Sequence, residues 1–188
     1  MAICAIGVSE AGIQFDGYEF PAASVFPSGL TPWADIAEVG TFGYTEVRTR
    51  RGEVLLVPSL DGDRVRAGAA AAGVPIIRRV DVWGLLLEPF LDTEFSEDHQ
   101  QRTNELLRAN GVPYDEAASL RAEVTDVMVA YNFLSMLWDW VHLGLGDVLS
   151  ALTGTLAGER FRLGPEEYTA FSWRAMEIAM RAGVAELP

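Results

Sequence analysis

The chain has 188 residues, and its 14 basic residues against 27 acidic ones give a formal net charge of −13 at pH 7. Every basic residue is an arginine, since the sequence contains no lysine. Nonspecific binding to nucleic acid or to an anionic membrane depends on cations that meet phosphate, so this charge argues against both. Mechanisms that need a lysine, such as a Schiff base or a phosphate-loop lysine, are excluded.

The composition is that of a folded protein, with 49% hydrophobic and 22% charged residues. The single Cys4 cannot form an intramolecular disulfide, which favours a reducing cytoplasm. No signal peptide is expected, because no positive residue precedes the first apolar residues and Glu10 follows soon after. The longest apolar run, 127–145, is interrupted by polar residues, so it predicts a buried helix and no membrane span.

The net charge and the predicted secondary structure both change near residue 80. Residues 1–80 hold seven arginines and nine acids, and residues 81–188 hold seven arginines and eighteen acids, so the net charges are −2 and −11. The first part predicts short β segments separated by turns. These segments are 2–8, 12–15, 18–20, 36–42, 44–50 and 53–57. The clearest hairpin joins the last two through Arg51-Gly52.

Helical patterns follow. One helix is expected over 61–72, and the later ones over 81–87, 97–110, 115–145, 147–156 and from Pro165 onward. Asp81, Ser96 and Asp115 are the expected N-caps, and Gly73, Gly111 and Gly183 the expected helix stops. In the long helix, an apolar stripe of alternating 4 and 3 spacing runs from Leu120 to Val141. The sequence thus predicts an α+β protein with a β-rich domain over 1–78 and an acidic domain of about five helices over 79–188.

The first part carries Gly12-Ile13, then Pro32-Trp33-Ala34-Asp35-Ile36, then Gly52-Glu53-Val54-Leu55 before the helix that starts at Asp61. This order resembles bacterial pleckstrin-homology-like domains. The resemblance implies a small antiparallel barrel or a strongly bent sheet that serves as a docking platform. Eukaryotic lipid-binding members hold phosphoinositides with basic residues near the first hairpin. Ser9-Glu10-Ala11-Gly12 has none, so lipid binding is not implied.

Four carboxylates in the acidic part form two spaced pairs, Glu94 with Glu97 and Glu123 with Asp126. The pattern is similar to the metal site of all-α nucleoside triphosphate pyrophosphatases of the MazG kind, which implies a Mg²⁺ or Mn²⁺ site and a hydrolase. Hard cations prefer such oxygen ligands. The alternative is that these acids lie on solvated faces, because acids are frequent here and the Ser96 cap would split the first pair.

A second polar set consists of Asn132, Ser135, Asp139 and His142, which would occupy one arc of the long helix. His142 beside Asp139 is a general-base or metal-ligand arrangement. A polar seam between helices or toward solvent explains the same spacing.

No complete catalytic set is present in the sequence, so we expect a noncatalytic cytoplasmic docking or interaction module without a cofactor. The β-rich part would be a platform, and the helical part would bind a protein partner or a second copy of the chain. Arginine groups in the first part are candidates for docking against acidic helices; they are Arg48, Arg50, Arg51, Arg64, Arg66, Arg78 and Arg79. The alternative is the Mg²⁺- or Mn²⁺-dependent hydrolase that uses the four carboxylates.

Overall fold

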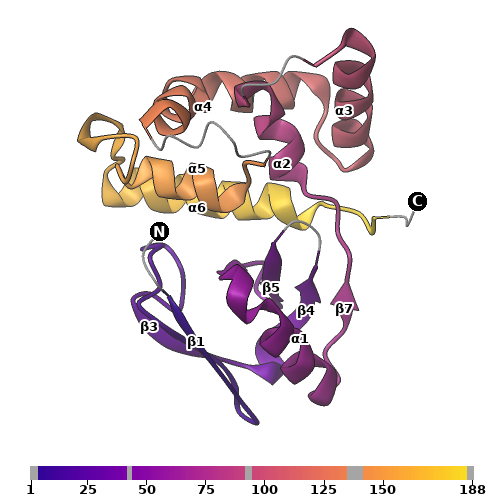
Figure 1. The fold of residues 1–188 in the computed structure, drawn as a ribbon, viewed down its shortest axis with the longest axis vertical. Helices are drawn as coiled ribbons and strands as arrows, with labels where there is room; N and C mark the ends of the chain where they lie inside the picture. Colours follow the sequence, from indigo (N-terminus) through magenta and orange to yellow (C-terminus); the bar gives the residue numbers. More distant parts are fainter. Residues whose placement is uncertain (1–3, 42–43, 92–94, 135–141, 186–188) are drawn as a thin grey trace. The chain divides into compact units, whose positions relative to one another are not determined.

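The computed structural model describes residues 4–41, 44–91, 95–134 and 142–185. The fold is α+β, as predicted, with strands first and helices after them (Figure 1). The chain divides into a β unit, formed by residues 1–80 with 183–188, and a helical unit, formed by residues 81–182.

The first sheet of the β unit is antiparallel and has the order β1-β2-β3. It consists of β1 (Ala5–Ser9), β2 (Gly12–Asp16) and β3 (Ser28–Pro32). The alternation along β2 turns Ile13 and Phe15 into the core, where both are fully buried. This face holds the first sheet in the unit, because strands this short need a buried side to be stable.

The second sheet has the order β6-β5-β4-β7. Its strands are β4 (Ile36–Gly40), β5 (Thr45–Thr49), β6 (Val54–Val57) and the short β7 (Ile76–Ile77). The hairpin predicted around Gly52 is confirmed: β5 and β6 pair antiparallel, and Gly52 has a φ of 84°. β7 pairs parallel with β4 after a helical crossover.

The two sheets do not close into a barrel, so the barrel form of the predicted β domain is wrong. A 3₁₀ turn, Trp33–Asp35, separates β3 from β4 and lets the chain leave one sheet for the other. Within the described residues, no ladder joins the two sheets. The other 3₁₀ turns are Ser59–Asp61, Glu88–Phe90 and Glu159–Phe161.

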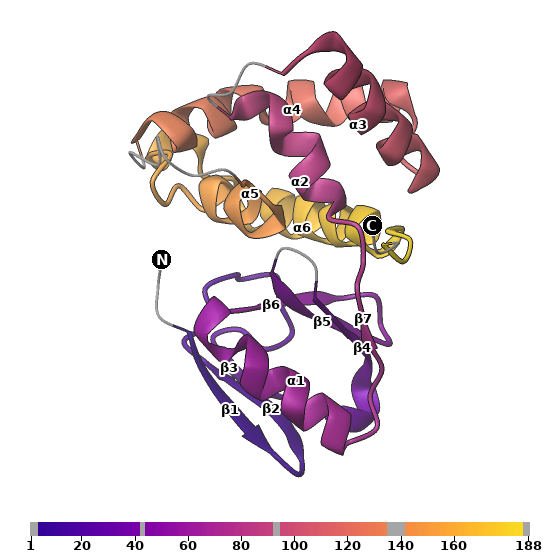
Figure 2. The ribbon, with the colours of Figure 1, turned by 45° about the vertical axis from the view of Figure 1, so that its right-hand side comes forward.

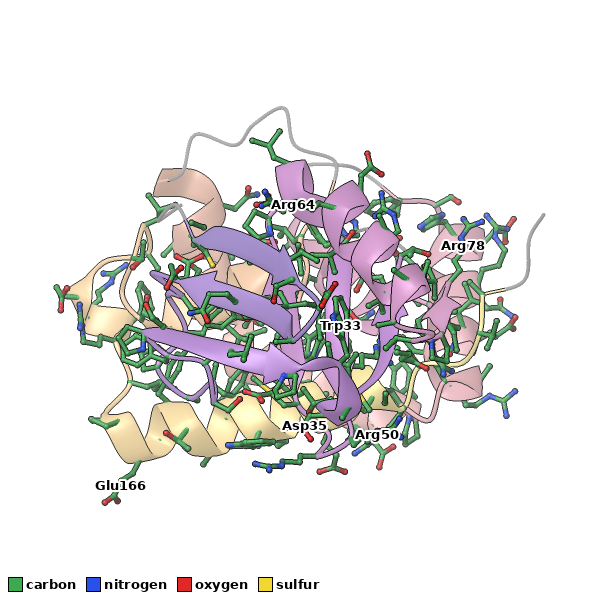
Figure 3. All side chains as sticks on the ribbon, turned by 90° about the horizontal axis from the view of Figure 1, so that it is seen from below. Trp33, Asp35, Arg50, Arg64, Arg78 and Glu166 are labelled. Carbon is green, nitrogen blue, oxygen red and sulfur yellow. The ribbon has the colours of Figure 1, made fainter. Side chains whose placement is uncertain are left out.

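Helix α1 (Gly62–Ala71) crosses from β6 to β7 and contacts β1 and β4. The Trp33 ring lies against it at Gly68, where an added Cβ would come within 2.8 Å of the ring (Figure 3). The indole Nε1 of Trp33 donates to the carbonyl of Ser9 at 2.9 Å, which holds the ring in this place. The helix ends as predicted at Gly73, whose φ is 71°.

The C-terminal segment returns to the β unit. Arg79 and Val184 form an antiparallel bridge. The amide of Val80 donates to the carbonyl of Gly183, and that of Ala185 to the carbonyl of Arg78. The chain past Gly183 thus extends the pairing of the segment after β7 (Figure 2). The sequence predicts Gly183 as a helix stop, but unlike Gly73 and Gly111 it does not have a positive φ.

The helical unit consists of α2 (Val82–Leu87), α3 (Glu97–Ala109), α4 (Tyr114–Leu134), α5 (Leu145–Leu152) and α6 (Pro165–Met180). The predicted cap at Asp81 is confirmed, since its side chain accepts from the amide of Gly84 at 2.8 Å. Ser96 likewise accepts from the amide of His99 at 3.3 Å. The Asp115 cap is wrong, because α4 already begins at Tyr114 and Asp115 is its second residue.

The core of the helical unit forms where α2, α4, α5 and α6 meet. The predicted stripe on α4 is buried where its side chains are described, at Leu120, Val124, Val127 and Tyr131. Trp83 of α2 is buried as well, and its indole Nε1 donates to the carbonyl of Ala175 at 2.9 Å. A buried indole that satisfies its N–H in this way ties α2 to α6.

The continuous helix expected over 115–145 is wrong in its last residues. Residues 142–144 are not helical, and α5 begins at Leu145. Asp147 accounts for this start, because its Oδ2 accepts from the amide of Gly144 at 2.8 Å. Residues 135–141 lie outside the described residues. In the part of the chain that is described, no helix combines the length and the apolar character needed to span a bilayer.

Candidate functional site

The three described carboxylates of the four proposed as metal ligands do not form one cluster. Glu97 is exposed on the first turn of α3, and Asp126 is exposed on α4. Glu123 pairs with Arg174 of α6. Glu94 lies outside the described residues, and among those described no group of three potential ligands could hold a metal ion. Glu123 thus lies on a solvated face, as the alternative interpretation of these acids predicts, where an arginine from α6 meets it.

The second polar set is divided in the same way. Asn132 donates from Nδ2 to the carbonyl of Phe90 at 3.0 Å and so joins α4 to the turn after α2. Ser135 and Asp139 lie outside the described residues. His142 does not continue α4, since it stands in the non-helical residues before α5. The 3, 4, 3 spacing therefore places no imidazole on the face of α4.

His142 belongs instead to a cluster with Asp81, Tyr131 and Asp147. Its Nε2 lies 2.8 Å from Oδ2 of Asp81, whose other oxygen caps α2. The hydroxyl of Tyr131 donates to Oδ1 of Asp147 at 3.1 Å, and Oδ2 of the same carboxylate caps α5. In each aspartate, one carboxylate oxygen therefore accepts a hydrogen bond from an amide at a helix start, and the other contacts a side chain from another segment.

Gly84 makes room for this imidazole. A Cβ on Gly84 would lie 2.7 Å from Cε1 of His142 and 3.0 Å from the Asp81 carboxyl. The side chain of His142 remains 40% exposed, whereas that of Asp81 is 12% exposed. The cluster is thus an accessible imidazole held by a nearly buried carboxylate.

Hydrogen bonding and burial shift two pKa values in the cluster. The hydrogen bond to Asp81 raises the pKa of His142 above its ordinary value of 6.5, although burial acts against this. Burial raises the pKa of Asp147 above its ordinary value, and its hydrogen bonds with Gly144 and Tyr131 oppose the effect only in part. The protonated imidazole is favoured, so the cluster is chemically a charge-assisted clamp between helix starts.

Sequence analysis identified Asp81 and His142 but not their contact, because 61 positions separate them. The Tyr131–Asp147 hydrogen bond joins two helices across 16 positions, and no local pattern predicts it either. The sequence indicates a helix cap at Asp81, but no local pattern indicates that the Asp81 and His142 side chains contact each other.

A groove follows α3 on the surface of the helical unit. It is open, has a volume of about 440 Å³, and is lined by Glu97, Gln100, Gln101, Asn104, Glu105, Arg108 and Tyr114. Tyr114, the first residue of α4, is 70% exposed. The lining positions on α3 recur at helical spacing, so they form one stripe along the helix. The sequence does not indicate this groove, because any exposed helix face carries a similar polar stripe.

The arginines of the β unit, considered above as docking groups, are largely engaged within that unit. Arg48 donates to Glu46, and Arg79 donates through two nitrogens to Glu38. Arg64 pairs with Asp61, and Arg66 with Asp63. Arg50 donates from Nε to the carbonyl of Ala34 at 2.9 Å. These contacts neutralise much of the arginine charge locally.

Cys4 is buried, and burial raises the pKa of its thiol. A neutral buried thiol is a weak nucleophile, so this residue behaves as a small apolar side chain.

No protein-family model, curated protein or solved structure matches the chain.

Proposed function

We propose that the chain is a noncatalytic docking protein whose helical unit binds a segment of a protein partner in the groove along α3. The observation that carries the proposal is this groove with Tyr114 at its end, 70% exposed. Tyrosine offers a large apolar ring and a hydroxyl at low entropic cost, which makes it a frequent interface anchor.

The helix that forms the groove is anchored from behind. Thr103 and Leu107 are buried on its inner face, and the hydroxyl of Thr103 donates to Glu88 at 2.7 Å. At its end the amide of Val112 donates to the carbonyl of Leu107 at 2.9 Å, across Gly111 with a φ of 78°. A preformed surface of this kind loses little entropy on binding.

The proposal includes a cytoplasmic location, supported by the lone cysteine of the chain. It also keeps the β unit as a second docking platform, in line with the pleckstrin-homology-like order of its segments.

The test is an amide chemical-shift titration of the full chain with three pools of short capped peptides, one basic, one neutral and one acidic. At least one pool is expected to shift amides of residues 97–114, and Tyr114→Ser should abolish most of the response. Val129→Ser is the matched control, because Val129 is a 56% exposed apolar residue on the same helix outside the groove. If no pool shifts these amides, or if the two variants respond alike, the proposed function is overturned.

A further inference from the structure

We infer that the segment bound in the α3 groove is an extended, positively charged stretch of another protein, with two cationic side chains four residues apart. The inference rests on the proposed function and adds the chemistry of the partner. Three properties of the groove support it: its charge, its carboxamides and the spacing of its carboxylates.

Charge favours a cationic occupant. The helical unit, residues 81–182, contains seven arginines and seventeen acids, and 7 − 17 gives −10. The groove itself is lined by Glu97 and Glu105 against Arg108, and the exposed Asp98 and Arg102 of the same helix balance each other. An acidic segment would meet like charge from the groove and from the whole unit, whereas a basic one is attracted by both.

The three carboxamides of the groove suit a polypeptide backbone. Gln100, Gln101 and Asn104 each carry a donor and an acceptor, as a peptide group does. The oxygen of Asn104 already accepts from Nη1 of Arg121 at 3.2 Å. Arg121 is fixed in turn by donating to the carbonyls of Leu85 and Leu86. The Nδ2 of Asn104 can donate to a carbonyl of the partner, and its oxygen keeps a second lone pair for an amide.

The spacing of the carboxylates favours an extended conformation. Glu97 and Glu105 are eight residues apart on α3, which corresponds to about 12 Å along the helix axis. In an extended chain, residues four apart are separated by about 13 Å and point to the same side. Glu97 and Glu105 also stand about 80° apart around the helix axis, so two cations at such positions can meet both carboxylates only through long, flexible side chains such as those of arginine. The Nε2 of Gln101 donates to Oε1 of Glu105 at 3.0 Å and so limits the motion of one of them.

A second copy of this chain is a poor source of the cations. No two of its 14 arginines stand four residues apart in the sequence, and in the β unit Arg48, Arg64, Arg66 and Arg79 pair with acids of that same unit. Freeing them would break these pairs before new ones form. The occupant is therefore assigned to a different protein.

The experiment measures the affinity of the full chain for capped heptapeptides by the same amide titration at about 0.1 M salt, where the Debye length is about 10 Å. The first probe has arginines at its second and sixth positions among glycines and serines. The others carry two adjacent arginines, two glutamates in place of the arginines, or serines only. The spaced-arginine probe is expected to bind most tightly, and Glu97→Gln with Glu105→Gln should weaken it by about three- to tenfold.

Asp126→Asn with Glu166→Gln is the matched control, since it removes the same charge from exposed positions outside the groove. This control should leave the affinity within about twofold of the original, because exposed charges beyond the Debye length are screened. Tighter binding of the neutral or acidic probe in the groove overturns the inference and leaves the proposed function standing. Equal effects of the two double variants would contradict the role of Glu97 and Glu105. Equal binding of the adjacent-arginine probe would contradict the inferred four-residue spacing of the two cations. If no probe binds in a Tyr114-dependent way, the proposed function fails with it.

Discussion

The two units treat their charged side chains differently. In the β unit, Glu53 is 2% exposed and accepts hydrogen bonds at 2.6 Å from the amide and the hydroxyl of Ser24. In the helical unit, Glu123 and Glu116 instead meet Arg174 and Arg181 at the surface. A buried charge is tolerated only with fixed partners, whereas an exposed one costs little and can be exchanged. Buried charge thus has a structural role at Glu53 in the β unit, whereas these two acids of the helical unit form ion pairs at the surface.

The largest expected effect comes from Glu53→Ala. The change removes an acceptor from two groups of Ser24, and hydrogen bonds to a charged group contribute about 1.5–3 kcal/mol each. We expect the free energy of opening of the β unit to fall by about 3 kcal/mol, measured by native-state hydrogen exchange at the β5 amides.

Glu166→Ala is the matched change in the helical unit. Glu166 points away from α6 into solvent, and its loss should stay within about 0.5 kcal/mol. Glu53→Gln, which keeps an acceptor, should fall between the two. Similar losses for the two alanine variants would contradict the division between the units.

A smaller effect is expected at two helical glycines, one in each unit. By helix propensity alone, alanine would stabilise either position by about 1 kcal/mol. At Gly68 the new Cβ would lie 2.5 Å from Cγ1 of Val8 and 2.8 Å from the ring of Trp33, two partly buried side chains that would both have to move. Gly68→Ala should therefore destabilise the β unit by about 1–3 kcal/mol in a denaturant titration.

Gly84→Ala should cost less, because the ring it meets belongs to His142, which is 40% exposed and can turn outward. This variant should also separate His142 from Asp81 and lower the pKa of the imidazole, which an NMR titration of the ring protons measures. Stabilisation by either alanine would show that the ring contacts do not constrain these glycines.

The smallest expected effect is a pH dependence from the His142 cluster, since solvent screens a partly exposed pair. The pKa of His142 is raised, so the folded chain binds this proton more tightly than the unfolded one. The resulting stabilisation is complete below the ordinary pKa of 6.5 and is lost as the pH rises through the folded-state value. The raised pKa of Asp147 acts in the same direction, because its neutral form is the one favoured by folding.

We therefore expect the melting temperature to fall as the pH rises from 6.5 through the raised folded-state pKa of His142. His142→Gln should flatten this part of the curve, and His99→Gln serves as the control with the other histidine of the chain. A slope that survives His142→Gln would assign the effect to other groups.

Local patterns predicted much of the fold. The Gly52 hairpin, the Asp81 and Ser96 caps and the Gly73 and Gly111 stops all depend on residues within a few positions of one another. The buried stripe on α4 followed from apolar periodicity in the same way. Such signals survive in a sequence because the groups that interact are close along the chain.

The candidate sites were predicted less well. Spacing grouped Glu123 with Asp126, but Arg174 of α6 meets Glu123 at the surface. The same kind of spacing assigned His142 to the long helix, although its partner is Asp81, 61 positions earlier. Periodicity describes one helix at a time and carries no information about which side chain another helix presents.

By itself, the sequence determined the α+β class, the acidic character of the helical part and the absence of any lysine chemistry. Only the tertiary structure decided that the sheets stay open, that residues 183–185 return to the β unit, and that a polar groove accompanies α3. Composition and local pattern are properties of neighbouring residues. Sheet closure, strand return and grooves depend on contacts between distant ones, whose free energy is set only when the elements pack.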